Sequence, residues 1–249
     1  MKTTGNTILI TGGNSGIGKE LAREFHKLGN KVIITGRRKD AIDEVLAANP
    51  GMDGYVLDVQ DEKAIEDFAA MMIRKYPDMN ILFNNAGIMK KEDIKGAGIS
   101  LKDAEDMVIT NLLAPIRLTA AFLPHLKKQK ESTIINTTSG LAFVPLTVTP
   151  TYNATKAALH SYSIALREQL KGTSVEVIEL IPPAVQTDLM PGHATNPNAL
   201  PLQDYINETM ALFKLQPTPS EICVERVKFL RNAEVEGRFG QTLTILNAA

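Results

Sequence analysis

The chain has 249 residues, of which 44% are hydrophobic and 22% charged, so it is long enough to bury a full hydrophobic core. This composition excludes a disordered, collagen-like or coiled-coil protein. The 27 Lys and Arg residues balance 28 Asp and Glu residues to a formal net charge of -1, and without a basic stripe we expect no nucleic-acid partner.

Short apolar segments alternate with helical segments from the N-terminus onward. We predict strands at 7–11, 31–35, 54–58, 80–84, 133–137 and 175–180. We predict helices at 17–28, 40–48, 62–75, 101–127 and 151–170. Pro115 should kink the helix over 101–127, because proline cannot donate to the preceding turn. A Pro-rich stretch follows at 182–219, then a predicted helix at 220–232 and a last strand at 242–246.

The predicted strands are continuously apolar, which is typical of a parallel sheet with helices on both faces. We therefore expect an α/β protein with a Rossmann-type, doubly wound sheet of about seven strands. No break in composition separates a second domain, so residues 1–249 are predicted to form a single dinucleotide-binding and catalytic domain. Apolar side chains within 188–217 suggest a substrate loop or lid, although a helix packed on the body would show the same pattern.

A glycine-rich turn joins the first strand to the first helix, with Gly12, Gly16 and Gly18 in a G-x-x-x-G-x-G pattern. Gly12 permits a tight turn, Gly16 lets the backbone approach a pyrophosphate, and Gly18 lets the helix pack closely on the strand. The helix N-terminus then points at the anion. Since the turn lies within the first βαβ unit, it predicts a dinucleotide site.

With this spacing the chain resembles the short-chain dehydrogenase/reductase family over essentially its whole length. Family motifs follow in order: Asp58-Val59, Asn84-Asn85-Ala86-Gly87, Asn111, Ser139 and Tyr152-Asn153-Ala154-Thr155-Lys156. Six motifs in the family's order and spacing are not expected by chance. The resemblance implies an NAD(P)(H)-dependent oxidoreductase that transfers hydride between nicotinamide and a ketone or secondary alcohol.

Tyr152 and Lys156 share one face of a predicted helix, which places an ammonium group beside a phenol. A nearby cation lowers a tyrosine pKa, which general acid catalysis near neutral pH requires. The resemblance implies that Tyr152 protonates the substrate oxygen, that Lys156 lowers the Tyr152 pKa and binds ribose, and that Ser139 hydrogen-bonds the substrate oxygen. It implies that Asn111 anchors a proton-relaying water.

The resemblance also implies a set of cofactor contacts along the carboxyl ends of the strands. Pro183 departs from it, because the family usually has glycine at this position. The implied cofactor-binding residues are Gly12, Asn14, Ser15, Gly16, Ile17, Gly18, Arg37, Arg38, Asp58, Val59, Asn85, Ala86, Gly87, Tyr152, Lys156, Pro182, Val185 and Thr187.

The second predicted strand ends with Gly36, where NAD enzymes of this architecture carry a carboxylate for the adenine ribose. Arg37 and Arg38 follow and could pair with a 2'-phosphate. NADP(H) is therefore favoured and NAD(H) remains possible, since Asn14 and Ser15 lack an extra basic side chain.

Phe143, Val144 and Leu146 suggest a mostly apolar pocket for a hydrophobic ketone or alcohol, with His193 a candidate for its rim. A non-catalytic dinucleotide sensor is the alternative function. A sugar-nucleotide epimerase or dehydratase is less favoured, because it normally needs a larger C-terminal substrate domain and only about 70 residues follow the sixth strand.

The remaining predictions concern location and assembly. One cysteine, Cys223, fits a reducing cytoplasmic setting, and no metal-ligand spacing occurs, so we expect no metal. The sequence has no run of 18 apolar residues, so we expect no membrane span. The predicted helices over 101–127 and 151–170 carry more apolar residues than one buried stripe requires. We therefore expect a homo-oligomer, either a tetramer or a dimer.

Overall fold

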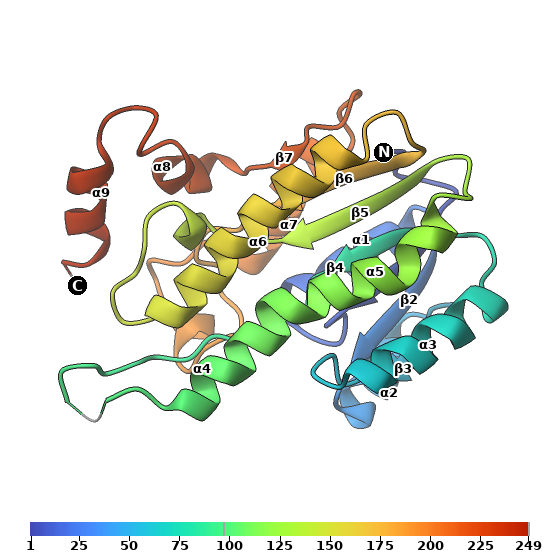
Figure 1. The fold of residues 1–249 in the computed structure, drawn as a ribbon, viewed down its shortest axis with the longest axis horizontal. Coiled ribbons are helices and arrows are strands. Elements are labelled where there is room, and N and C mark those ends of the chain that lie inside the picture. The colour runs from blue at the N-terminus through green and yellow to red at the C-terminus, as the bar shows by residue number, and fades with distance from the viewer. Residues whose placement is uncertain (97, 249) are drawn as a thin grey trace.

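The computed structural model describes residues 1–96 and 98–248, and its centre is one seven-stranded parallel sheet. The strand order is β3-β2-β1-β4-β5-β6-β7, so the order reverses between β1 and β4 (Figure 1). In sheets of this kind, ligands bind outside the carboxyl ends of the strands at that reversal. The predicted doubly wound α/β fold is therefore confirmed.

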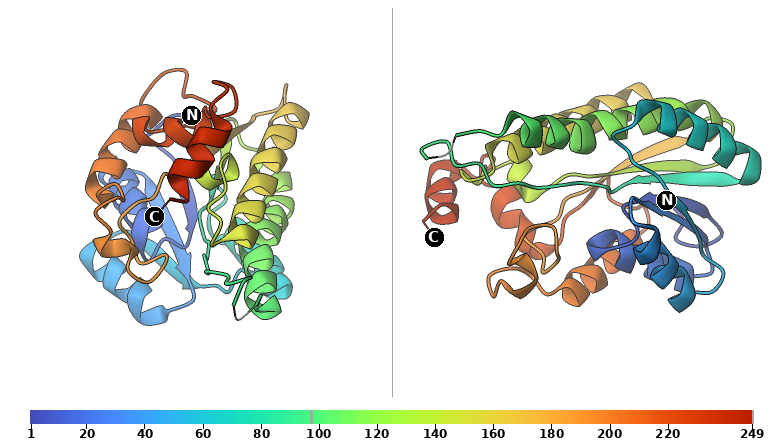
Figure 2. Two further views of the ribbon diagram at one scale, coloured as in Figure 1. Left: turned by 90° about the vertical axis from the view of Figure 1, so that its left-hand side faces the viewer. Right: turned by 90° about the horizontal axis from the view of Figure 1, so that it is seen from below.

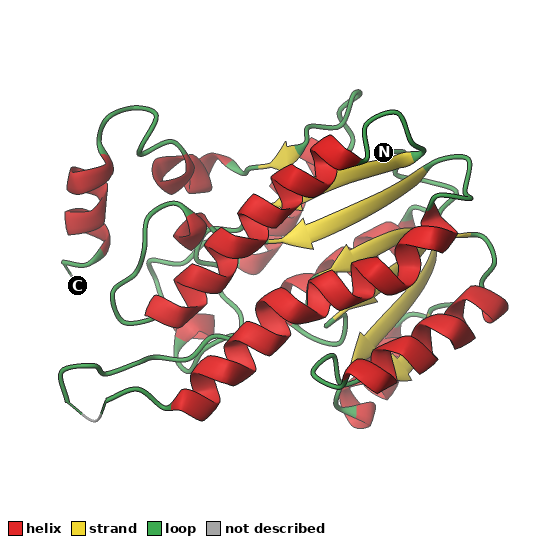
Figure 3. Cartoon of the chain, in the orientation of Figure 1, coloured by secondary structure: helices red, strands yellow, loops and turns green. Residues whose placement is uncertain are grey.

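Most element bounds lie close to those predicted (Figure 3). The strands are β1 (Thr7–Thr11), β2 (Lys31–Gly36), β3 (Asp53–Val56), β4 (Met79–Asn84), β5 (Ser132–Thr137), β6 (Val175–Leu180) and β7 (Glu221–Ile222). The helices are α1 (Gly16–Lys27), α2 (Lys39–Ala48), α3 (Glu62–Lys75), α4 (Leu101–Val108), α5 (Ala114–Leu126), α6 (Pro150–Gln169), α7 (Leu202–Phe213), α8 (Lys228–Arg231) and α9 (Phe239–Leu246).

Two helical layers cover the sheet (Figure 2). Helices α1, α2 and α7 pack on one face, where Phe25 and Phe213 meet edge to face at 5.5 Å. Helices α3, α5 and α6 cover the other face. Alternate strand residues such as Ile8 and Leu9 point to opposite layers and are both fully buried. Burial on both faces explains the continuous apolar character of the strands.

Helices α4 and α5 form one continuous helical rod joined by a π-helical turn at Ile109–Leu113 (Figure 1). Pro115 lies in the first turn of α5, directly after the π-helical turn, where a missing N–H is tolerated. The irregularity predicted at Pro115 is therefore a π-helical turn just before this residue. The rod contains an 18-residue window of mean hydropathy 1.4, which by length and composition alone would suit a membrane span. Its contacts with β4, β5 and α3 account for this apolar character.

The two C-terminal predictions were wrong. The predicted helix at 220–232 begins instead as the edge strand β7, and only Lys228–Arg231 is α-helical. The predicted strand at 242–246 is helix α9. Leu243 and Leu246 lie one turn apart and pack together on the cluster around Val144, so helical spacing rather than β propensity decides this segment.

The predicted lid divides into two parts. Residues 186–200 form a loop closed at its base by a bridge between Val185 and Leu200. Residues 202–213 form α7, whose Tyr205 and Phe213 are fully buried in the core. Only the loop half contributes to the cavity described next.

Candidate active site

A cavity of about 840 Å³ opens at the carboxyl ends of β1, β2, β4, β5 and β6. Every residue predicted to bind the cofactor lines it, and so do Ser139, Tyr152 and Lys156. Asn111 does not line the cavity and is fully buried behind it. The sheet therefore brings together residues that are up to 175 positions apart in the chain.

The glycine-rich turn has no room for side chains at Gly12, Gly13 and Gly18. A Cβ on Gly12, which has φ +65°, would lie 2.9 Å from the Ala86 Cα, and a Cβ on Gly18 would lie 2.5 Å from the Gly12 carbonyl oxygen. Gly16 has φ +52°, a conformation that favours glycine. These glycines hold the backbone in a turn that opens onto the cavity.

The end of helix α1 at this turn suits an anion. Its first turn carries no acidic residue, and in the described chain Ser15 precedes it without a side-chain capping bond, so the amide groups at this end face the cavity. Two buried hydroxyls on the cavity wall, Thr35 Oγ1 and Thr137 Oγ1, lack hydrogen-bond partners among the described residues. Together these features fit a dinucleotide.

Thr11 and Asn85 fasten the turn to the end of β4. Asn85 Nδ2 donates to the carbonyl oxygens of Thr11 and Gly12 at 3.0 and 3.3 Å. Thr11 Oγ1 accepts from the backbone N–H groups of Asn85 and Ala86. The sequence analysis named Asn85 only as a cofactor contact and overlooked Thr11, which its position at the end of a buried strand could have indicated.

The far end of the cavity is basic. Arg37 and Arg38 line it after β2, and Asp58 and Val59 line it after the neighbouring strand β3. A Cβ at Gly36 would lie 2.4 Å from Asn14 Oδ1, so the Asn14 side chain occupies the space beside Gly36. The site has Gly36 where related NAD sites place a carboxylate, and two arginines directly after it.

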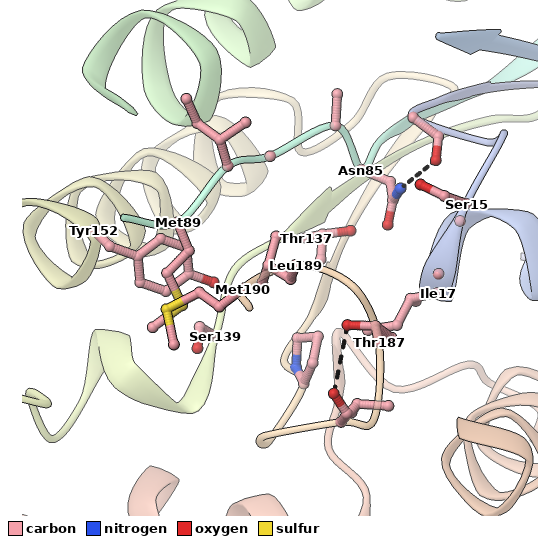
Figure 4. Close-up of a pocket in the computed structure, with 18 of the residues that line it drawn as sticks. Ser15, Ile17, Asn85, Met89, Thr137, Ser139, Tyr152, Thr187, Leu189 and Met190 are labelled. Atoms are coloured by element: carbon pink, nitrogen blue, oxygen red, sulfur yellow. Dashed lines mark hydrogen bonds between the residues drawn. The ribbon is translucent and has the colours of Figure 1, made fainter. Parts of the chain in front are cut away.

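Ser139, Tyr152 and Lys156 meet at the other end (Figure 4). Ser139 follows β5, and its Oγ accepts from the Leu141 N–H at 3.1 Å. Lys156 Nζ donates to the Thr137 carbonyl oxygen at 2.8 Å and lies 5.6 Å from the centre of the Tyr152 ring. The Tyr152 hydroxyl points toward Ser139.

Burial is the main influence on the pKa values of Tyr152 and Lys156. It raises the pKa of Tyr152 to about 12, partly opposed by a hydrogen bond with Ser139, and lowers the pKa of Lys156 to about 8. Desolvation therefore opposes the expected lowering of the Tyr152 pKa by Lys156, and that role of Lys156 stays a prediction. Tyr152 is a protonated phenol at neutral pH.

Asn111 lies in the π-helical turn and clamps the segment after β4. Its Oδ1 accepts from the Ile88 N–H at 2.9 Å, and its Nδ2 donates to the Ile88 carbonyl oxygen at 2.8 Å. Nδ2 also donates to Thr155 Oγ1 at 3.3 Å, next to Lys156. Asn111 therefore joins the wall of the cavity to the helix that carries the tyrosine.

A buried carboxylate lies behind the Ser139 loop. Glu179 is fully buried and accepts from Thr138 Oγ1 at 2.6 Å, and His160 Nδ1 lies 2.8 Å from Glu179 Oε2. With Glu221 these residues place possible ligand atoms within 4.8 Å of one another. Arg231 donates to both Glu221 oxygens, which pairs that carboxylate already. The absence of a metal stays a prediction.

The wall beside Tyr152 is largely apolar. Met89 and Met190 pack against Tyr152, with Leu141 and Leu146 next to them. Leu230 and Leu246 arrive from the C-terminal helices, a contribution that sequence reasoning missed because it had assigned these residues to a different helix and a strand. Sequence reasoning also missed Lys90 and Lys91, while the candidate His193 does line the cavity.

The segment after β6 completes the cavity floor. Pro182, Val185 and Thr187 line it, and the Pro182 carbonyl oxygen accepts from the Gly140 N–H at 2.9 Å. Pro183 also lines it, so proline at the usual glycine position leaves the backbone on the cavity wall.

Comparisons with known proteins agree with this geometry. A family model described as "short chain dehydrogenase" matches residues 6–197. The "Uncharacterized oxidoreductase DltE" of Bacillus subtilis is 44% identical over 237 residues, 94% of this chain and 93% of that protein. A "Serine 3-dehydrogenase" of Agrobacterium fabrum is 39% identical over 184 residues, 73% of each chain.

A solved structure, "The Closed form of serine dehydrogenase complexed with NADP+", has a TM-score of 0.76 and 30% identity, and the match covers 86% of this chain and 91% of that one. The family motifs, the strand order and the shared fold agree. The chain belongs to the short-chain dehydrogenase/reductase family and is an NAD(P)-dependent oxidoreductase that acts on CH–OH or C=O groups.

Proposed function

We propose that the protein is an NADP(H)-dependent carbonyl reductase or secondary alcohol dehydrogenase, with Ser139, Tyr152 and Lys156 at its reacting centre. The observation that carries the proposal is that these three residues share one cavity with the glycine-rich turn. The nicotinamide, when bound, supplies or accepts the hydride.

Tyr152 holds the proton for this reaction on its phenolic oxygen. Its pKa of about 12 keeps that proton in place at neutral pH, ready for donation to a substrate oxygen in the direction of reduction. Ser139 donates a second hydrogen bond to the same oxygen as negative charge develops there. Lys156 is anchored through the Thr137 carbonyl, so its remaining protons are available to a ribose hydroxyl and to the phenol.

Asn111 is proposed to anchor a proton-relaying water beside Lys156. Its clamp on Ile88 and its bond to Thr155 fix its amide within reach of that helix. The remaining predicted contacts, from Asp58 and Val59 to Val185 and Thr187, are proposed as cofactor contacts because they line the same cavity.

The preference for NADP(H) is supported by Arg37 and Arg38 beside Gly36, where no carboxylate side chain stands. A guanidinium group pairs with a 2'-phosphate, and the absent carboxylate removes repulsion. The similar serine dehydrogenase structure that carries NADP+ supports the same assignment. NAD(H) remains the second candidate cofactor.

Apolar groups are proposed to flank the reacting carbon, because Met89, Met190, Leu141 and Leu146 surround Tyr152. This favours a ketone or secondary alcohol with hydrophobic substituents at that carbon.

A homo-oligomer in the cytoplasm is also proposed. Helix α6 leaves Ala154, Ala157 and Ile164 exposed on its outer side, and small residues let two helices approach closely. A tetramer or dimer would bury this face directly behind Tyr152 and Lys156. Light scattering at micromolar concentration tests it, and a fully active 27 kDa species would disprove it.

The test of activity is a panel of ketones and alcohols assayed with each of the four nicotinamide cofactors. We expect Tyr152→Phe to bind the cofactor normally and to lower turnover by at least about 100-fold, the scale of lost general acid catalysis. Tyr162→Phe, on the same helix but outside the cavity, is the matched control. Cofactor binding without turnover of any substrate would favour the dinucleotide sensor instead.

A further inference from the structure

Three basic side chains gather at the substrate end of the cavity. Lys90 and Lys91 follow β4, and His193 belongs to the loop between β6 and α7. Two segments about 100 residues apart thus bring positive or hydrogen-bonding groups to the same part of the wall. The hydride-transfer role assigned to Ser139 and Tyr152 uses none of them.

Their position separates them from the pyrophosphate turn. Met89, next to Lys90 in the chain, and Met190 pack against Tyr152. Figure 4 shows both methionines beside Tyr152 and Ser139, while Ser15 and Asn85 lie on the opposite side of the cavity. The two segments that carry these basic residues therefore lie on the Tyr152 side of the cavity.

The backbone that carries the lysines is held on both sides. Met89 is buried before them, and Glu92, only 8% exposed, follows. The Glu92 carboxylate accepts from the Thr151 N–H at 2.9 Å and from Thr151 Oγ1 at 3.0 Å, at the first turn of α6. The backbone next to the two exposed lysines is thereby tied to the start of the helix that carries Tyr152.

Lys90 and Lys91 are exposed at this end of the cavity, which Asp188 also lines. Burial and the positive charge of Lys91 together lower the pKa of His193, so the two side chains lie within electrostatic reach. Within residues 1–96 and 98–248, neither Lys90 nor Lys91 forms an ion pair, and the nearby Asp188 pairs with neither. A cavity wall with unpaired positive charge attracts an anionic group on its ligand.

We propose that Lys91 and His193, with Lys90 beside them, bind a carboxylate at the end of the substrate remote from the reacting carbon. The inference rests on the proposed function, since the same molecule presents its alcohol or ketone to Tyr152. Lys91 supplies the charge and His193 a hydrogen bond, while the apolar wall of Met89 and Met190 contacts the carbon chain between the two groups. The substrate class is thus a hydroxy acid or keto acid rather than a neutral ketone.

The test compares keto acids with their methyl esters. The series has one, two or three methylenes between ketone and carboxylate: 3-oxobutanoate, 4-oxopentanoate and 5-oxohexanoate. Binding is measured by calorimetry on the NADP+-loaded protein, and reduction is measured with NADPH. For at least one chain length we expect the acid to bind at least about 10-fold more tightly than its ester, the scale of a charge-assisted hydrogen bond.

Variants assign that preference to the residues. Lys91→Gln and His193→Gln should each lower the acid-to-ester ratio of affinities, by about 10-fold for the lysine and less for the histidine. Lys95→Gln is the matched control, because Lys95 is an exposed lysine of the same loop outside the cavity lining. Its ratio should equal that of the wild type.

Two failures are distinguishable. Equal affinities for acid and ester at every chain length, or ratios unchanged by Lys91→Gln and His193→Gln, would overturn the carboxylate subsite even if esters are reduced well. Tight binding of an acid without reduction of any ketone would instead support the subsite and contradict the proposed oxidoreduction.

Discussion

The two ends of the cavity are built in different ways. The cofactor end is made mainly of backbone: Gly12, Gly16 and Gly18 shape the turn, and Asn85 ties it to β4. The substrate end is made of side chains from several separate segments, including those of Met89, Met190 and Leu246. Backbone geometry can be shared across a family, whereas a wall of side chains can change with each substrate.

The two ends also differ in how distant parts of the chain support them. The cofactor end depends on neighbouring strands and one hydrogen-bonded asparagine. At the substrate end, Asn247 accepts from the Thr147 N–H at 2.7 Å and donates to the Pro145 carbonyl oxygen at 3.1 Å. The C-terminal helix α9 therefore holds the loop after Ser139. This difference predicts which variants change cofactor binding and which change substrate binding.

Gly18→Ala should have the largest effect on the cofactor end. Its Cβ would meet the Gly12 carbonyl and Asn85 Nδ2, so the turn must shift, and we expect at least about 10-fold weaker NADPH binding from this overpacking. Gly240→Ala has open space around its Cβ and should bind NADPH normally. Fluorescence titration with NADPH measures both variants. Unchanged affinity in Gly18→Ala would show that the cofactor end tolerates side chains.

Lys156 connects the two ends, and its burial predicts a pH dependence of stability. Between pH 8 and its unfolded pKa of about 10.5, the unfolded chain binds a proton that the folded chain has released, so the free energy of unfolding rises with pH. Tyr152 acts in the opposite sense only above pH 10, because its pKa is raised from 10 to about 12.

Urea unfolding at pH 8 and pH 9.5 measures this effect against Lys156→Met. We expect the wild type to gain about 1 to 2 kcal/mol more than the variant over this interval. Equal gains would show that Lys156 is not desolvated in the folded protein.

The choice of cofactor depends on a pair of residues at the adenine end. Gly36→Asp alone should weaken binding of both cofactors, because its Cβ would collide with the Asn14 side chain. Combined with Asn14→Gly, the new carboxylate has room, and we expect the NADPH-to-NADH ratio of kcat/KM to fall by about 10-fold. Asn14→Gly alone is the control. A double variant that keeps the wild-type ratio would contradict the placement of the ribose beside Gly36.

The smallest predicted effect falls on the substrate end. Asn247→Ala frees the loop after Ser139 from α9, and we expect KM for the best substrate to rise by about threefold to tenfold, the scale of one lost hydrogen-bonding side chain. The Kd for NADPH should stay constant. Gln241→Ala, an exposed residue of the same helix, is the control. A parallel change in both constants would show that the two ends are not separately supported.

Local sequence was sufficient for the first six strands and for the cofactor end. Continuous apolar strands predict burial on both faces, and glycines at 12, 16 and 18 predict a turn without side chains, since both are properties of a few consecutive residues. The i, i+4 spacing likewise placed Tyr152 and Lys156 on one helix face.

Tertiary structure decided the protonation of that pair, because desolvation depends on everything packed around it. Tertiary structure also decided the secondary structure of the C-terminal segment. Its β-branched and leucine residues suit either a strand or a helix, and the packing of Leu243 and Leu246 against Val144 favours the helix. Lys91 and His193 line one cavity because two loops about 100 residues apart in the chain both reach it. Sequence periodicity determines which face of a helix or strand is buried. Which side chains line the cavity beside it depends on segments that are distant in the chain.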